Sequence, residues 1–172
     1  MNNSLKIAHR GYMRYTHSHG KDTGNNYKDN SIKSINNAIL NGFNYIEIDL
    51  QLCKDGNIVL YHDLFIKDKL VSELTYKEIK GIDNEIITFE FLLQNIVKRG
   101  LRIGLFLNLK GPNITGRGEK QHKLQHILLF ILLTNNINLE NIFISSYNLQ
   151  NINILSKLKK KLNLTFKIGL FI

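Results

Sequence analysis

Short apolar runs along this chain alternate with stretches in which apolar residues recur every three or four positions. In residues 31–41, Ile32, Ile35 and Ile39 follow the helical spacing, whereas residues 45–53 alternate apolar and polar positions as a strand does. The same patterns predict further strands over 5–8, 58–61, 101–109, 142–145 and 165–172, and further helices over 72–80, 89–98, 120–134 and 149–161.

Strands that alternate with helices predict parallel β/α units, closed into a barrel or laid out as an open doubly wound sheet. Polar residues follow the predicted strands at their carboxyl ends: His9, Asp49, His62, Lys110 and Ser146. A β/α barrel carries its chemistry on that face, and His9-Arg10-Gly11 is not the Gly-rich phosphate loop of a doubly wound sheet. We therefore predict an α/β fold of the TIM-barrel type in a single domain over residues 1–172, with its six strands parallel.

Composition and charge narrow the class of protein only slightly. The net charge is +9, but the one dense basic cluster lies at residues 157–161 on a predicted helix without interleaved aromatic residues. We interpret that cluster as a solvated helix face and expect no nucleic-acid partner. Cys53 is the only cysteine, which favours a reducing, cytoplasmic setting, and the longest apolar run, 127–133, is too short to cross a bilayer.

The candidate catalytic and metal-binding residues lie on, or directly after, the first three predicted strands. Glu47 and Asp49 project from the same face of their strand, because side chains alternate with a period of two. His9 and His62 end the predicted strands on either side of that strand in the chain. Burying two carboxylates together without a cation is unfavourable, so this pattern predicts a hydrolytic site that holds a metal ion.

The motifs together resemble the glycerophosphodiester phosphodiesterases, a family of the phospholipase C-like phosphodiesterase superfamily. The matching segments occur in the family's order: His9-Arg10-Gly11, Asp29-Asn30-Ser31, Gly42 to Leu50, Asp55 to Asp63, Ile87 to Glu90 and Ile144 to Tyr147. This resemblance implies a β/α barrel that cleaves glycerophosphodiesters, as small-molecule substrates, to glycerol 3-phosphate and an alcohol.

The resemblance also implies a role for each matching residue. His9 and His62 would act as general acid and base, Arg10 and Lys110 would bind the phosphate, and Glu47, Asp49 and the residue at position 108 would bind a divalent cation. Carboxylate oxygens favour Mg²⁺ or Ca²⁺ as that ion.

Two departures from the family pattern bear on activity. The family's fourth strand ends in Glu-x-Lys, but this chain has Asn108 in the place of that Glu, and an amide oxygen brings no negative charge. Asp63 and Glu119 are the candidate acids that would compensate for it. The chain also matches only about six of the family's eight β/α units, which leaves an open barrel edge. We expect a homo-oligomer through this edge, an unusual closure of the barrel, or a degraded gene product.

Two alternatives to a glycerophosphodiesterase stay open at this stage. One is a phospholipase D-like enzyme acting on lipid head groups, which an apolar barrel mouth would favour. The other is a catalytically impaired pseudoenzyme. The remaining histidines are interpreted as a solvated loop (His17 and His19) and an ordinary helix surface (His122 and His126).

Overall fold

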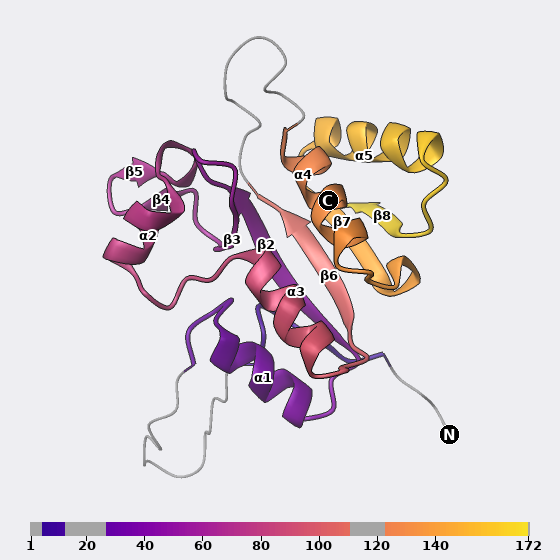
Figure 1. The fold of residues 1–172 in the computed structure, drawn as a ribbon, viewed down its shortest axis with the longest axis horizontal. Helices are drawn as coiled ribbons and strands as arrows, with labels where there is room; N and C mark the ends of the chain where they lie inside the picture. The colour runs from indigo at the N-terminus through magenta and orange to yellow at the C-terminus, as the bar shows by residue number, and fades with distance from the viewer. Residues whose placement is uncertain (1–4, 13–26, 111–122, 172) are drawn as a thin grey trace.

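The computed structural model describes residues 5–12, 27–110 and 123–171, and these form one twisted, mainly parallel sheet with helices packed on it (Figure 1). The strands are β1 (Ile7–Ala8), β2 (Tyr45–Leu52), β3 (Ile58–Leu60), β4 (Phe65–Ile66), β5 (Lys69–Leu70), β6 (Gly104–Leu109), β7 (Ile142–Ser146) and β8 (Lys167–Leu170). The α-helices are α1 (Ile32–Leu40), α2 (Tyr76–Ile82), α3 (Phe89–Lys98), α4 (Lys123–Thr134) and α5 (Leu149–Lys161), with short 3₁₀ turns at Val71–Glu73 and Leu139–Asn141.

Five strands of the main sheet are parallel, in the order β1-β2-β6-β7-β8. The sixth strand, β3, pairs with β2 in the antiparallel sense, so the prediction that all six strands are parallel was wrong. The reason is the short turn between β2 and β3, where the amide of Cys53 donates to the Asn57 carbonyl at 2.8 Å and Gly56 has φ +90°. A link this short makes a hairpin, because a parallel connection needs a crossover of a dozen or more residues.

The edge of β2 is shared between two strands, which brings distant parts of the chain together. β1 pairs with Tyr45 and Ile46 at the start of β2, and β3 pairs with Leu50 to Leu52 at its end. The residues that follow β1 and those that follow β3 are therefore delivered to the same edge of β2, near its carboxyl end.

The two faces of β2 are both buried, but they differ in chemistry. Ile46, Ile48 and Leu50 belong to the main hydrophobic core with residues of α1 and α3. Glu47, Asp49 and Gln51 alternate with them on the opposite face, where they are also buried. The polar face of β2 is thus the interior of the barrel arc.

Two local features differ from the sequence prediction. The helix predicted over 72–80 is instead a 3₁₀ turn at Val71–Glu73 followed by α2, because Thr75 starts a new helix through a capping box with Glu78. The small antiparallel hairpin of β4 and β5 was not predicted. The other helices and strands lie within the predicted ranges or differ from them by a few residues at their ends.

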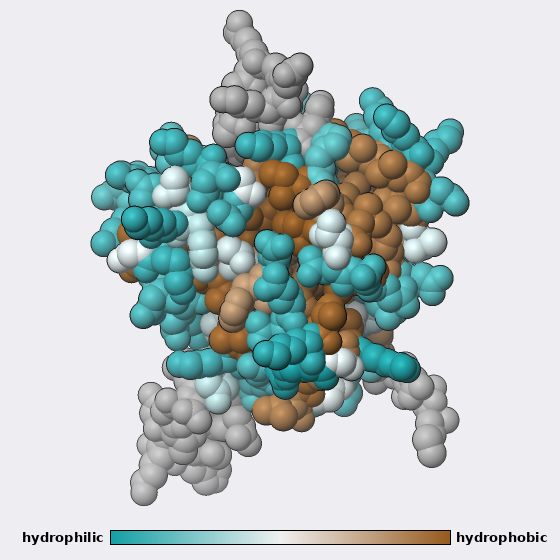
Figure 2. All heavy atoms as spheres, in the orientation of Figure 1, coloured by the Kyte–Doolittle hydropathy of each residue, from teal (hydrophilic) through white to brown (hydrophobic). Residues whose placement is uncertain are grey.

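α4 differs from the other helices because it is apolar on nearly every side. Leu128 and Leu132 are buried against the sheet, whereas Phe130 and Leu133 are exposed. Figure 2 shows apolar surface in the region of α4. Among the described residues no helix has the length and apolar character needed to cross a membrane.

Candidate active site

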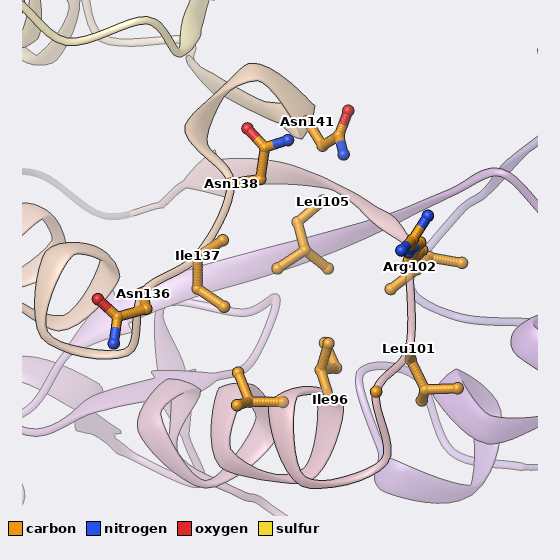
Figure 3. Close-up of a pocket in the computed structure, with 11 residues that line it drawn as sticks. Ile96, Leu101, Arg102, Leu105, Asn136, Ile137, Asn138 and Asn141 are labelled. Carbon is orange, nitrogen blue, oxygen red and sulfur yellow. The ribbon is translucent and has the colours of Figure 1, made fainter.

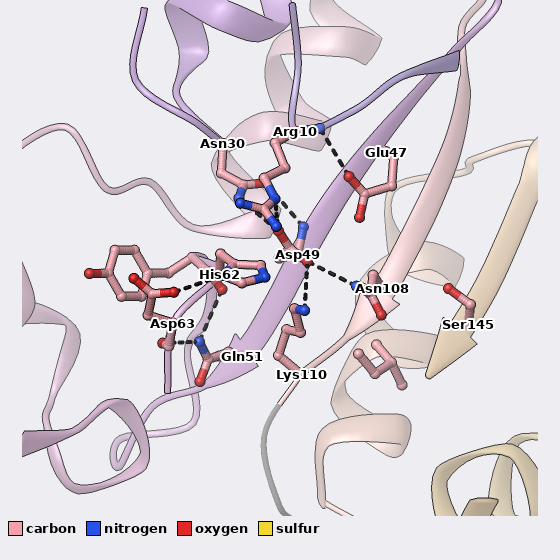
Figure 4. Close-up of polar contacts among 12 residues, drawn as sticks. Arg10, Asn30, Glu47, Asp49, Gln51, His62, Asp63, Asn108, Lys110 and Ser145 are labelled. Atoms are coloured by element: carbon pink, nitrogen blue, oxygen red, sulfur yellow. Dashed lines mark hydrogen bonds and ion pairs between the residues drawn. The ribbon is translucent and has the colours of Figure 1, made fainter. Parts of the chain in front are cut away.

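Most of the residues predicted to carry the chemistry come together at the carboxyl ends of the strands, as Figure 4 shows for Arg10, Asp49 and Lys110. His9 and Arg10 follow β1, and His62 follows β3. Glu47 and Asp49 project from β2, and they are in register with Phe106 and Asn108 on β6, which Lys110 follows.

Asp49 is the centre of this cluster and is almost completely buried, with 1% of its surface exposed. Its Oδ1 accepts a hydrogen bond from Asn108 Nδ2 at 2.9 Å and lies 3.5 Å from Lys110 Nζ. Its Oδ2 accepts from Asn30 Nδ2 at 3.0 Å and lies 3.3 Å from Arg10 Nε. Two cations and two amides thus surround one carboxylate, which accounts for the stability of a charge at this depth.

Arg10 is held by backbone conformation as well as by its charge. It adopts a left-handed conformation with φ +52°, which is uncommon for a residue with a side chain. Its backbone amide donates to Glu47 Oε2 at 2.9 Å, and its Nη1 donates to Asp29 Oδ2 at 3.1 Å. The turn therefore aims the guanidinium at Asp49 while the main chain engages Glu47.

Glu47 carries less compensating charge than Asp49. Its Oε2 lies 3.9 Å from His9 Nε2, and His9 is largely exposed. Burial, together with the nearby negative charge of Asp49, raises the pKa of Glu47 to about 7, against the lowering effect of Arg10 and Lys110. The site thus holds a carboxylate whose charge would be stabilised by one more cation.

His62 is oriented by its neighbour in the chain. Its Nδ1 lies 2.7 Å from Asp63 Oδ1, and Gln51 Nε2 donates to the backbone oxygens of Tyr61 and Asp63 at 3.0 and 2.6 Å. Gln51 projects from β2 on the same face as Asp49, so the segment that carries His62 is fixed to the site strand. Because its carboxylate engages His62, Asp63 acts here as an orienting residue for a histidine.

Sequence reasoning missed the part that Asn30 plays. Its Oδ1 accepts from the Asp49 amide at 3.0 Å while its Nδ2 donates to the Asp49 carboxylate, and its own amide donates to the Arg10 carbonyl at 2.9 Å. Asn30 also has a left-handed φ of +58°. The signal was the Asp29-Asn30-Ser31 motif, in which Asn tolerates this conformation better than most residues.

A divalent cation is compatible with the donors present. The buried oxygens available to it are those of Glu47 and Asp49 and Oδ1 of Asn108, which is buried and has no hydrogen-bond partner within the described part of the chain. Oxygen donors of this kind suit Mg²⁺ or Ca²⁺. A cation here would compete with Lys110 and Arg10 for Asp49, and within residues 5–12, 27–110 and 123–171 no group of three acidic, His or Cys side chains stands ready to hold a metal.

The described residues do not include His17, His19, Glu119 or His122, so the predictions for them stay predictions. His126 is exposed on α4.

A hollow of about 390 Å³ lies at the other end of the strands and is separate from this site. Residues before β6, such as Leu101 and Arg102, and residues before β7, such as Ile137 and Asn138, line it together with Ile96 of α3 (Figure 3). None of the predicted site residues contributes to it. The amino ends of barrel strands usually serve stability and not catalysis.

The fold and the site together define an incomplete β/α barrel of the phosphodiesterase type, with acids, cations and histidines at the carboxyl ends of its strands. The family model for the glycerophosphoryl diester phosphodiesterase family matches residues 9–169. The chain belongs to that family, as its ordered motifs predicted, and the predicted barrel class is confirmed.

Known proteins similar to this chain agree with that assignment. The glycerophosphodiester phosphodiesterase GDPD2 of Arabidopsis thaliana is 34% identical over 109 residues, which are 60% of this chain and 27% of that protein. A solved glycerophosphodiester phosphodiesterase of Parabacteroides distasonis has 25% identity and a TM-score of 0.75 over 96% of this chain and 64% of its own. A phosphodiesterase of Oleispira antarctica, solved with its product sn-glycerol-3-phosphate, has 21% identity and a TM-score of 0.67 over 95% of this chain and 63% of its own. The chain thus spans less than two thirds of the length of each of these proteins.

Proposed function

We propose that this protein hydrolyses glycerophosphodiesters to glycerol 3-phosphate and an alcohol. The observation that carries the proposal is the convergence of Arg10 and Lys110 on Asp49, within 3.3 and 3.5 Å, at the carboxyl end of the sheet. Two cationic side chains beside Asp49, with His9 before it and His62 after it in the chain, form a site suited to an anionic phosphate.

In this proposal the role of each side chain follows from its position in the site. Arg10 and Lys110 bind non-bridging phosphate oxygens and stabilise the charge that develops there during cleavage. Of His9 and His62, one accepts a proton from the water that attacks phosphorus, and the other donates a proton to the oxygen of the alcohol that leaves as its bond to phosphorus breaks. Asp63 fixes the orientation of His62 through the 2.7 Å contact between its Oδ1 and His62 Nδ1.

We propose that Glu47, Asp49 and the amide oxygen of Asn108 hold the divalent cation. When bound, the ion would offset phosphate charge and polarise the phosphorus centre. Glu47 would be the residue most changed by it, because its carboxylate has the least compensating charge in the cluster.

A second candidate is a phosphodiester-binding protein with little or no turnover. The hydrogen bond from Asn108 to Asp49 favours it, because an amide donor stands where the family has a third carboxylate.

A cytoplasmic location stays a prediction that rests on the single cysteine, Cys53.

Removing the Lys110 cation tests the proposal. With glycerophosphocholine as substrate and glycerol 3-phosphate as the measured product, Lys110→Met should lower kcat/KM by about a hundredfold or more, as expected for loss of one charged group that binds the phosphate. Lys161→Met, on the exposed end of α5, should leave it unchanged. Equal activities of wild type and Lys110→Met would remove Lys110 from the site.

A further inference from the structure

A groove of about 560 Å³ begins at the proposed phosphate site and runs along the carboxyl ends of β6 and β7. It is lined by Leu64, Leu109, Lys110, Ser146, Tyr147, Asn148 and Leu149. Lys110 therefore belongs both to the cluster around Asp49 and to the groove, so a phosphate bound by Lys110 would direct one of its ester arms into the groove.

Two polar groups of the groove, the Ser146 hydroxyl and the Asn148 amide oxygen, form hydrogen bonds within the protein. Ser146 Oγ donates to the Leu109 carbonyl at 2.9 Å and accepts from the amide of Asn148 and from Asn151 Nδ2. Asn148 Oδ1 accepts from the Gln150 amide and caps α5. The Ser146 hydroxyl and the Asn148 amide oxygen are therefore occupied within the protein.

What the groove presents to a ligand is mainly apolar. Leu64 is 38% exposed, Tyr147 64% and Leu149 58%. The ring of Tyr147 is stacked on that of Phe171, with centroids 5.0 Å apart, so this wall is held in place. Exposed apolar walls of this kind favour a ligand that removes them from water.

The charges of the groove select against a cationic ligand. Among the lining residues there is no acidic side chain, and Lys110 Nζ lies 5.5 Å from the centroid of the Tyr147 ring. The aromatic face that a quaternary ammonium group would use therefore already has a cation over it. A choline arm would meet repulsion here, whereas an uncharged alkyl arm would not.

We propose that this groove binds the alkyl or acyl arm of a phosphodiester substrate, and that the protein prefers apolar arms to choline-type arms. The inference rests on the proposed function, because it takes Lys110 as the phosphate-binding group. It favours substrates derived from single-chain phospholipids over water-soluble glycerophosphodiesters with a cationic arm.

Binding of phosphate monoesters tests the groove without requiring turnover. In calorimetric titrations, hexyl phosphate should bind about tenfold more tightly than ethyl phosphate, because part of its four additional methylenes leaves water. Phosphocholine should bind no more tightly than ethyl phosphate. Leu149→Ser and Tyr147→Ala should each reduce the preference for the hexyl chain by severalfold, and Leu162→Ser, an exposed residue beyond the end of α5, should keep it.

The outcomes separate this inference from the proposed function. Equal affinities for hexyl and ethyl phosphate, or tighter binding of phosphocholine, would overturn the apolar subsite even if glycerophosphodiesters are hydrolysed. Chain-length-dependent binding without hydrolysis of any diester would support the subsite and reject the enzyme. Absence of binding of all three monoesters would reject the phosphate site and the subsite with it.

Discussion

Asn108 is the residue on which the strength of the metal site depends. Its amide satisfies one oxygen of Asp49, and its own oxygen is buried without a partner in the described residues. The present residue therefore stabilises the cluster without a metal, whereas a carboxylate at this position would add a third negative charge beside Glu47 and Asp49.

Asn108→Glu should shift this balance toward the cation. We expect a free energy of unfolding lower by about 1–3 kcal/mol in the presence of EDTA, because a hydrogen bond to a buried carboxylate is lost and a like charge is added. We also expect at least tenfold tighter binding of Mg²⁺ or Ca²⁺, measured as a larger shift in melting temperature at millimolar cation. Gln94→Glu, on the exposed face of α3, should change neither quantity. Unchanged cation affinity in Asn108→Glu would separate Asn108 from the metal site.

For single residues, the sequence was sufficient to predict which side chains share one face of a strand. Glu47 and Asp49 share a face because side chains alternate along β2, so the period of two was sufficient. The contacts of Asn30 with Asp49 could not be predicted in the same way, because they depend on a left-handed backbone 19 residues earlier in the chain.

At the scale of elements, the turn between β1 and α1 is the most constrained connection. Gly11 has φ +85°, and a Cβ atom there would lie 2.4 Å from Ser34 Oγ and 2.8 Å from the Ser34 carbonyl carbon. This close approach lets the Tyr12 amide donate to the Ser34 carbonyl at 2.9 Å, which joins the turn that carries Arg10 to α1.

Gly11→Ala should therefore destabilise the protein more than the same change at a glycine of similar conformation. Gly42 has φ +71° but no atom within 4 Å of the added Cβ, so Gly42→Ala reports the backbone cost alone, about 1 kcal/mol. Gly11→Ala adds the clash with Ser34, and we expect a total loss of about 3 kcal/mol or more in urea unfolding. Equal losses in the two variants would show that α1 can move away from the turn.

The alternation of strands and helices was predicted correctly, because the spacing of apolar residues along the chain follows the local backbone geometry. The antiparallel direction of β3 was not predicted, although Asp55-Gly56 between β2 and β3 is a typical tight-turn sequence. The length of the link between β2 and β3 decides the direction, because a parallel connection needs a crossover of a dozen or more residues and this link is much shorter. The strands β4 and β5 are two residues long each, which is too short for a periodic pattern of apolar residues.

At the scale of the whole molecule, β8 is the outer strand of the sheet, and within the described residues it pairs only with β7. Next to it on the inner side, aromatic rings extend from Phe106, stacked on Phe143 at 4.4 Å, to Phe171 and Tyr147. An unpaired strand edge beside partly exposed aromatic rings favours association with another chain.

We therefore predict that the purified chain forms homodimers or larger species through β8. Light scattering after size exclusion should give a mass that rises with concentration over the micromolar range. Leu170→Lys, on the edge strand, should shift the protein toward the monomer, whereas Leu162→Lys should not, although both leucines are similarly exposed. A monomer at all concentrations, for wild type and both variants alike, would contradict this prediction.

We propose that the cluster around Asp49 supports phosphodiester hydrolysis with histidines as acid and base. Formation of glycerol 3-phosphate from glycerophosphodiesters by wild type, His9→Ala, His62→Ala and His126→Ala, at saturating Mg²⁺ or Ca²⁺, tests it most directly. We predict turnover by wild type and by His126→Ala, whose changed residue lies on the surface of α4, and losses of a hundredfold or more in the other two variants. No product from the wild-type protein, or product formation that survives both His9→Ala and His62→Ala, would contradict the claim.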